Sequence, residues 1–218
     1  MKVAVIGVGG VGSWCAEALL RSGITELVLM DDDVVVESNL NRQCEATSLT
    51  LGRLKVEAMK ERLLTINPTA SIEIRAERFT EPGQLDLLQA DFIVDAIDSV
   101  DCKAELILSA TERKIPIVSS MGAAMRKDPT LVRLKRFDKI TGDALAKALR
   151  NRFKRLGRYP TVKFLCAVSE EPAEKGLGKF SQMPVTAAFG MSLAAAVLVA
   201  KAGIEPATHG FSVRCSTN

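Results

Sequence analysis

The stretch that decides the fold is Lys2-Val3-Ala4-Val5-Ile6-Gly7-Val8-Gly9-Gly10-Val11-Gly12. Its first half is apolar after the lysine, which is typical of a strand buried on both faces of a sheet. Its second half has the spacing G-x-G-x-x-G, and a helix is predicted to follow over residues 13–22. In such a turn the first glycine permits a tight bend, the second lets backbone N–H groups approach a phosphate, and the third lets helix and strand pack closely. The helix N-terminus adds partial positive charge, so the sequence favours a nucleotide-binding turn over a bare tight turn.

Apolar strands and helical segments alternate along the first 120 residues. Further strands are predicted at residues 26–30, 71–76, 91–96 and 116–119, with helices at residues 51–66 and 101–113. This alternation predicts an α/β fold, with a Rossmann-like, mostly parallel central sheet, helices on both faces and an antiparallel extension in the C-terminal part. Ligands of such sheets bind at the carboxyl ends of the strands. We therefore expect one crevice to be lined by residues 7–12, 31–33, 95–99 and 119–123.

The chain is expected to form one domain in three parts. Residues 1–125 are the nucleotide-binding adenylation core, and residues 126–203 are a basic segment that binds substrate and closes the same domain. Residues 204–218 lack periodicity and are predicted to be a flexible tail. Within the second part we expect a strand at residues 163–168, a loop at 170–183 and an apolar helix from Pro184.

The composition is that of an ordinary soluble protein, with 47% hydrophobic and 25% charged residues and a net charge of +3 in 218 residues. The five cysteines form no C-x-x-C pair and there is one histidine, so the sequence offers no zinc set. Irregularly spaced cysteines favour reduced thiols, and no secretory signal is visible, so a cytoplasmic location is expected. Residues 185–202 are almost uncharged and near the minimum length for crossing a bilayer. Their many alanines favour a buried core helix over membrane association.

An acidic residue ends the second predicted strand, about twenty positions after the glycine turn. Asp31 occupies this position, and in dinucleotide-binding folds such a residue forms hydrogen bonds with the ribose hydroxyls. On these features alone the sequence fits an NAD-dependent dehydrogenase equally well. The residues that follow favour a different chemistry.

Four ordered motifs resemble the ubiquitin-activating-like superfamily, which includes ThiF, MoeB and HesA. They are the glycine turn; Asp31-Asp32-Asp33 followed by Ser38-Asn39-Leu40-Asn41-Arg42-Gln43; Lys55, thirteen residues after the arginine; and Asp95-Ala96-Ile97-Asp98-Ser99. The resemblance is close over residues 2–125 and looser beyond them. It implies an ATP-dependent adenylating enzyme, in which a carboxylate oxygen attacks the α-phosphate of ATP and pyrophosphate leaves.

The resemblance and the chemistry of phosphates imply a role for each matched residue. Negative charge builds up on the phosphates, so catalysis depends on positioning and on cations, which Arg42 and Lys55 can supply. Asp98 is the expected ligand of Mg²⁺. Asn39 is expected to bond phosphate or substrate oxygens, and Asp31 the ribose. The expected nucleotide-binding set is Gly7, Gly9, Gly10, Gly12, Asp31, Asp33, Asn39, Arg42, Lys55, Asp98 and Ser99, and the expected catalytic residues are Arg42, Lys55 and Asp98.

Taken singly, most of these residues have a structural interpretation. Lys55 can be a solvated helix residue, Asp95 a helix or turn cap, and Asp33 a turn former. The ordered set with preserved spacing favours the functional interpretation.

Within the superfamily the chain is most similar to the TcdA-type group, the tRNA threonylcarbamoyladenosine dehydratases. The resembling residues are Gly9-Gly10-Val11-Gly12-Ser13-Trp14, Asn41-Arg42-Gln43, Asp95 to Val100, Lys114-Ile115-Pro116, Ser119 to Ala123, and Val185-Thr186-Ala187 with Phe189-Gly190. The resemblance implies that ATP activates the threonyl carboxylate of the modified adenosine beside the anticodon, after which the side chain cyclises with net loss of water. The alternatives are adenylation of the C-terminus of a ubiquitin-like sulfur-carrier protein and a nucleotide-binding module without activity. ThiF and MoeB usually carry two zinc-binding C-x-x-C pairs, which this sequence lacks.

The basic segment, residues 126–158, gives information about the binding partner. Residues 126–158 contain twelve Lys or Arg and three Asp. Such a patch can neutralise phosphates, although a solvated helix face is the usual explanation of a charge run. The resemblance favours tRNA, and not DNA, as the nucleic-acid partner.

The resemblance also implies a homodimer whose sites borrow residues across a two-fold interface. Relatives carry an N-terminal helical segment that contributes an arginine to the partner's site. That arginine has no counterpart here and the tail after Gly203 is unlike the family, so the expectation from the resemblance is either a shortened sequence or an impaired activity. Cys166 is the least implausible catalytic thiol, but no cysteine is assigned that role.

Overall fold

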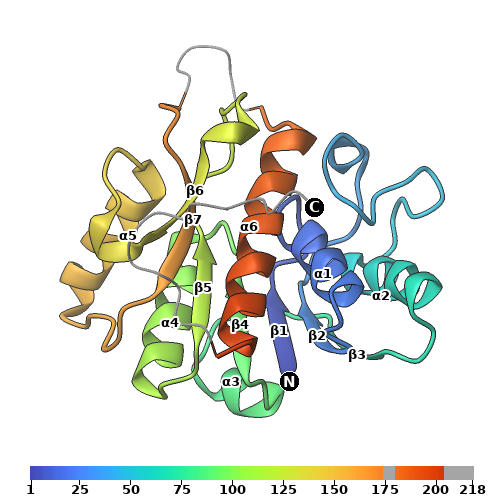
Figure 1. The fold of residues 1–218 in the computed structure, drawn as a ribbon, viewed down its shortest axis with the longest axis horizontal. Coiled ribbons are helices and arrows are strands. Elements are labelled where there is room, and N and C mark those ends of the chain that lie inside the picture. Colours follow the sequence, from blue (N-terminus) through green and yellow to red (C-terminus); the bar gives the residue numbers. More distant parts are fainter. Residues whose placement is uncertain (174–179, 204–218) are drawn as a thin grey trace, which may run out of the picture.

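The structure, a computed structural model, describes residues 1–173 and 180–203. Its centre is a seven-stranded sheet in the order β3-β2-β1-β4-β5-β7-β6 (Figure 1). Neighbouring strands are parallel except β6 and β7, which are antiparallel. The strands are β1 (Lys2–Ile6), β2 (Glu26–Met30), β3 (Ser71–Arg75), β4 (Phe92–Asp95), β5 (Ile117–Ser120), β6 (Val132–Arg136) and β7 (Leu165–Ser169). The predicted parallel sheet with an antiparallel extension is confirmed.

Helices connect most of the strands and cover both faces of the sheet. The α-helices are α1 (Gly12–Arg21), α2 (Lys55–Ile66), α3 (Gly83–Leu88), α4 (Val100–Glu112), α5 (Ala144–Leu156) and α6 (Met183–Lys201). Short 3-10 helices occur at Glu37–Asn39 (η1), Pro129–Leu131 (η2) and Phe137–Lys139 (η3).

Two hydrophobic cores lie on the two faces of the sheet. Side chains of a strand alternate between faces, so Val3 and Val5 of β1 pack with α1, α2 and α6, whereas Ala4 and Ile6 pack with α3, α4 and α5. Figure 1 shows α6 crossing the face of the sheet on the same side as α1. The uninterrupted apolar run of β1 is explained by this burial on both sides.

The order of the strands creates a crevice between β1 and β4. The chain passes from β1 to β2 and β3 on one side, then returns to β4 on the other side of β1 and continues to β5. The connections that leave β1 and β4 therefore lead to helices on opposite faces, α1 and α4. Such a switch point is where ligands of open α/β sheets bind.

Three elements have no counterpart among the predictions: α3, β6 and α5. The last two lie in the basic segment, where charge conceals an apolar pattern. In α5 the buried residues Ala146, Leu149 and Phe153 have helical spacing among the cations. The helix α2 begins at Lys55, later than predicted, because residues 51–54 form a turn in which Leu54 pairs with Val34 as an isolated bridge. Part of the predicted loop 170–183 and all of the predicted tail 204–218 lie outside the described residues.

The apolar helix α6 packs on the sheet as a core helix, as the sequence predicts. It is long and apolar enough to cross a membrane, but half of its apolar window is buried inside the molecule. At Gly190 the backbone of α6 lies close to that of α1. A Cβ atom on this glycine would lie 2.6 Å from the Val11 carbonyl oxygen and 2.9 Å from the Cys15 backbone nitrogen. This glycine therefore lets α6 lie directly against the start of α1 and the glycine turn.

A buried polar cluster fixes the end of β4. Asp95 and Lys103 are fully buried and form an ion pair of 2.7 Å. The Asp95 carboxylate also accepts hydrogen bonds from the Ser119 hydroxyl (2.6 Å) and the Ile97 backbone N–H (3.1 Å). The cluster joins β4, α4 and β5 below the crevice. Asp95, the first acid of the D-x-x-D motif, is therefore a structural residue that does not reach the crevice.

We predict that Gly190→Ala lowers the free energy of unfolding by about 1–3 kcal/mol, because the added methyl group collides with backbone atoms that cannot turn away. Denaturant unfolding measures this loss. Gly83→Ala is the matched control, since a Cβ atom at Gly83 meets nothing within 4 Å. An equal effect of the two substitutions would contradict the close packing of α6 on α1.

We also predict that Lys103→Met lowers the free energy of unfolding by about 3–5 kcal/mol, because it leaves the Asp95 charge buried without its partner. The double variant with Asp95→Asn and Lys103→Met should recover part of this loss in the same denaturant experiment. A single variant as stable as the wild type would show that the pair does not stabilise the fold.

Candidate nucleotide site

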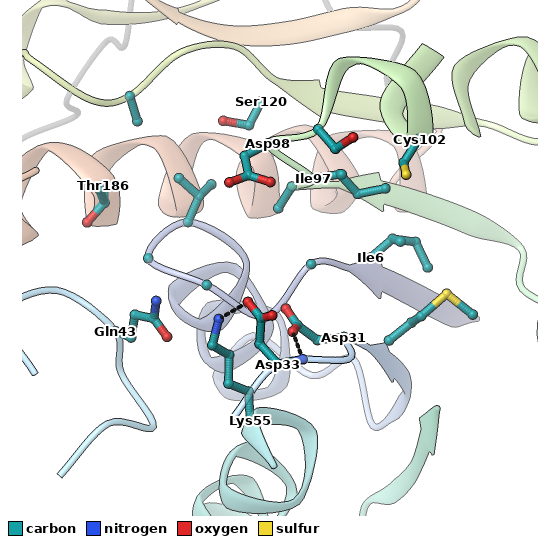
Figure 2. A pocket seen from close by; sticks show the side chains of 18 of the residues that line it. Ile6, Asp31, Asp33, Gln43, Lys55, Ile97, Asp98, Cys102, Ser120 and Thr186 are labelled. Carbon is teal, nitrogen blue, oxygen red and sulfur yellow. Dashed lines mark hydrogen bonds and ion pairs between the residues drawn. The ribbon is translucent and has the colours of Figure 1, made fainter. Parts of the chain in front are cut away.

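A pocket of about 470 Å³ lies at the carboxyl ends of β1, β2, β4 and β5. It is lined by Gly7, Gly9, Gly10 and Val11, by residues 31–33, by residues 96–99 and by residues 120–124, together with side chains of η1, α2, α4, α5 and α6. The predicted convergence of four separate segments on one crevice is confirmed. Figure 2 shows the pocket from close by.

Close contacts between backbone atoms require glycine at two positions of the turn. Gly7 has a φ of +92°, and a Cβ atom there would lie 2.7 Å from the Ala96 carbonyl oxygen. A Cβ atom on Gly12 would lie 1.8 Å from the Gly7 carbonyl oxygen. Gly12 is buried and does not line the pocket. Its place in the motif therefore reflects close packing of α1 on β1, so the expectation that Gly12 contacts the nucleotide needs this correction.

The turn offers free hydrogen-bond donors. Among the described residues, the backbone N–H groups of Gly9, Gly10 and Val11 have no hydrogen-bond partner. They lie in the pocket wall just before the N-terminus of α1, which carries partial positive charge. Unpaired N–H groups at a helix N-terminus form a binding site for an anion, so this geometry fits a phosphate group.

Asp31 holds the glycine turn against the end of β2. Its carboxylate accepts hydrogen bonds from the backbone N–H groups of Val8 (2.7 Å) and Asp33 (2.9 Å). Burial raises the pKa of Asp31, although Lys55 and the two N–H groups oppose this shift. A carboxylate oxygen accepts more than one hydrogen bond. Asp31 can therefore hold the turn and still receive a ribose hydroxyl, the role that the sequence suggests.

Lys55, the first residue of α2, forms an ion pair with Asp33, with 2.7 Å between the ammonium nitrogen and the carboxylate oxygen. The Lys55 side chain is 8% exposed and that of Asp33 is 57% exposed, so the pair reaches solvent only on the aspartate side. Both residues line the pocket beside the glycine turn (Figure 2). The predicted cation thus lies in the pocket wall, already paired with a carboxylate.

The loop that contains η1 supplies Asn39 and Arg42. The Asn39 side chain accepts a hydrogen bond from the Val36 N–H (3.1 Å), which turns this largely buried side chain toward the pocket. The Arg42 guanidinium donates to the Ser38 carbonyl (2.6 Å), and its own carbonyl accepts from the Trp14 indole (2.9 Å). These bonds hold the arginine against α1 at the rim of the pocket.

Gln43 is a pocket residue for which the sequence suggests no separate role. It is 7% exposed, and its side-chain oxygen is buried without a hydrogen-bond partner. In Figure 2 it lies beside the glycine turn on the side of Lys55. A buried polar atom without a partner is rare and marks a place where a ligand or water completes the structure. The signal in the sequence is its position next to Arg42 in the motif.

Asp98 and Ser99 lie on the opposite wall, between β4 and α4. Asp98 is exposed, and in Figure 2 it lies across the glycine turn from Asp33 and Lys55. Ser99 is the N-cap residue of α4, but its side chain makes no capping hydrogen bond. Asp98 has no ion-pair or hydrogen-bond partner among the described residues, so its carboxylate is available to a ligand.

Carboxylates also gather at the end of β2. The carboxylate oxygens of Asp31, Asp32 and Asp33 lie within 4.8 Å of one another. Arg78 pairs with Asp32 (3.1 Å), and Lys55 pairs with Asp33. The charges of Asp32 and Asp33 are therefore compensated, whereas the pocket acids Asp31, Glu77 and Asp98 form no ion pair among the described residues.

The cysteines give no support for a catalytic thiol. Cys15, Cys44 and Cys166 are buried, and burial raises the pKa of each thiol. Cys166 lies in β7, outside the pocket. Cys102 lines the pocket from α4 and is partly exposed, and Cys215 lies outside the described residues.

Comparison with known proteins agrees with this site. A family model, that of the ThiF family, matches residues 1–216. The chain is 42% identical over 151 residues to the tRNA threonylcarbamoyladenosine dehydratase of Haemophilus influenzae, which covers 68% of this chain and 58% of that protein. The chain thus spans less than two thirds of the length of this relative.

Two crystal structures of E. coli tRNA N6-threonylcarbamoyladenosine dehydratase have a similar fold. The complex with ATP has 36% sequence identity and a TM-score of 0.84, over 93% of this chain and 87% of that chain. The complex with AMP has 35% identity and a TM-score of 0.84, over 94% and 88%. Since the family model covers nearly the whole chain, the chain belongs to the ThiF family.

Proposed function

We propose that this chain is an ATP-dependent adenylating enzyme that activates the threonyl carboxylate of threonylcarbamoyladenosine in tRNA, which leads to cyclisation of that side chain. The observation that carries the proposal is the convergence of unpaired backbone N–H groups, Arg42, Lys55 and Asp98 on one pocket. The similarity to tRNA threonylcarbamoyladenosine dehydratases, one of which was crystallised with ATP and with AMP, also supports the proposal.

The pocket suits adenylation better than hydride transfer. In adenylation a carboxylate oxygen forms a bond to the α-phosphorus of ATP, the bond to the β-phosphate oxygen breaks, and pyrophosphate leaves. The charge on the phosphates is stabilised by cations and by fixed N–H groups. Arg42 and Lys55 supply the cations, and Gly9, Gly10 and Val11 supply the N–H groups. Arg42 and Lys55 have no corresponding task in hydride transfer.

The second half of the reaction needs no group of the enzyme as a nucleophile. A nucleophile within the activated side chain attacks the acyl carbon, the bond to the phosphate oxygen breaks, and AMP leaves. We place the reacting side chain against the part of the pocket formed by residues 120–124 with Leu145. Most of its side chains are small, which leaves room for the reacting group.

We propose Asp98 as the carboxylate that holds Mg²⁺. Mg²⁺ is typically bound by one or two carboxylates together with phosphates of the substrate, and it neutralises the phosphate charge. An uncompensated carboxylate across from the glycine turn fits this requirement. We further propose a cytoplasmic homodimer. The free buried cysteines suit a reducing compartment, and the exposed apolar side chains of Met183 and Met191 on α6 suit a subunit interface.

The reaction can be followed by exchange of radiolabelled pyrophosphate into ATP. We predict exchange that depends on tRNA carrying threonylcarbamoyladenosine. Exchange that depends instead on a small carrier protein ending in Gly-Gly would show a ThiF- or MoeB-like substrate. Binding of ATP without exchange under either condition would contradict an adenylating activity.

Arg42→Ala should lower the rate of this exchange by roughly 10²–10³-fold while leaving the fold intact, because it removes a cation that stabilises the phosphate charge. Arg113→Ala is the matched control, since this exposed arginine pairs with Asp86 away from the pocket. Circular dichroism checks the fold of both variants. Unchanged exchange in Arg42→Ala would remove the role assigned to this residue.

A further inference from the structure

The basic segment, residues 126–158, divides into two groups once its contacts are known. Eight of its twelve cations have a partner within the protein. Arg126 is buried and faces Asp143. Five more cations form ion pairs: Arg133 and Lys135 with Glu170, Arg136 with Asp138, Arg152 with Asp101, and Arg158 with Glu105 and Glu112. Arg150 donates hydrogen bonds to the Phe137 and Ile140 carbonyls, and Lys127 also has a partner. Arg126 is buried, whereas most of the other pairs lie at the surface, where a single ion pair contributes little to stability. A polyanion must compete with the acids of these pairs, so the cations without a partner are the ones most available to it.

The remaining four are Lys139, Lys147, Lys154 and Arg155, whose side chains are exposed and form no hydrogen bond or ion pair among the described residues. Three of them lie on α5. Lys147 and Lys154 are two turns apart on one side of the helix, and Arg155 lies beside Lys154. We call Lys147, Lys154 and Arg155 the α5 basic face.

The stability of α5 explains only part of this face. The helix contains five cations and no acid, so it has no stabilising pairs at i,i+4, and neighbouring like charges cost about 0.2–0.5 kcal/mol for each pair. The helix dipole accounts for Lys154 and Arg155 in the last turn, but a cation in the first turn, such as Lys147, opposes it. A helix that keeps such a conflict is a candidate for a binding surface.

The face begins beside the pocket. Leu145, two residues before Lys147, lines the pocket, and Asp143 caps the start of the helix through the Ala146 N–H. From Lys147 to Lys154 the helix rises about 10 Å, which matches roughly three nucleotides of a stacked strand. The chain's one tyrosine, Tyr159, follows the helix and is 60% exposed. Aromatic side chains beside cations are typical of surfaces that bind unpaired nucleotides.

We propose that the α5 basic face binds the sugar–phosphate backbone of the RNA strand that flanks the nucleotide held in the pocket. This inference rests on the proposed function. It assigns the contact with the RNA backbone to three of the twelve cations in residues 126–158. RNA fits better than a membrane surface, because the apolar side of α5, with Ala146, Leu149 and Phe153, is buried in the protein and leaves no anchor for a lipid phase.

Direct binding tests the proposal without requiring catalysis. The full chain, the double variant Lys147→Gln/Lys154→Gln and the control Lys60→Gln/Lys201→Gln are titrated into a fluorescent anticodon stem-loop RNA that carries threonylcarbamoyladenosine. The control removes two lysines from α2 and α6, on the opposite face of the sheet. Each variant loses the same charge, so a general electrostatic effect is equal in both. Circular dichroism verifies the fold.

At about 0.1 M salt we expect the α5 variant to bind roughly tenfold more weakly than the control, with a salt dependence of log K that is shallower by about 1.5. Its affinity for ATP should remain that of the wild type. Equal affinities of the two variants, or no binding by the wild type, would overturn the proposal. The proposal would also be overturned if the α5 variant kept its affinity for the RNA but lost its binding to vesicles of anionic phospholipid. Pyrophosphate exchange tests the proposed function separately, so the two failures are distinguishable.

Discussion

The close approach of three backbone segments at the end of β1 is the constraint on which the rest of the structure depends. The Gly7 carbonyl lies where a side chain of Gly12 would be, and the Ala96 carbonyl lies where a side chain of Gly7 would be. These contacts bring the start of α1 and the end of β4 together at the switch point of the sheet. They also leave the N–H groups of Gly9, Gly10 and Val11 facing the pocket without partners.

The polar residues around this turn fall into two groups: some stabilise the fold, and the others line the pocket. Asp95 and Lys103 are fully buried and brace the end of β4, and Asp31 ties the glycine turn to the end of β2. Asp98 and Arg42 lie in the pocket wall. The two acids of the D-x-x-D motif thus have different tasks, because a step of three residues takes the chain from the buried strand to the mouth of the pocket.

The central features of the fold and the site follow from sequence patterns of short range. The apolar run of β1, the glycine spacing and the alternation of strands and helices predict the parallel sheet and the crevice. Patterns of this kind cannot show pairing between distant residues. The ion pair between Lys55 and Asp33, the hydrogen bond from Ser119 to Asp95 and the contact of Gly190 with α1 all join segments far apart in the chain. In α5, Ala146, Leu149 and Phe153 have helical spacing, but the many charged residues between them make the pattern hard to recognise in the sequence. The helix and its basic face were therefore identified only from the contacts of each cation.

The central claim is that this glycine turn, with Arg42, Lys55 and Asp98 around it, binds a nucleoside triphosphate and not a dinucleotide. Isothermal titration of the full chain with ATP and Mg²⁺, and separately with NAD⁺, tests this claim most directly. The account predicts saturable binding of ATP at one site per chain, and no measurable heat from NAD⁺ at the same concentrations. Binding of NAD⁺ with equal or higher affinity than ATP would contradict it.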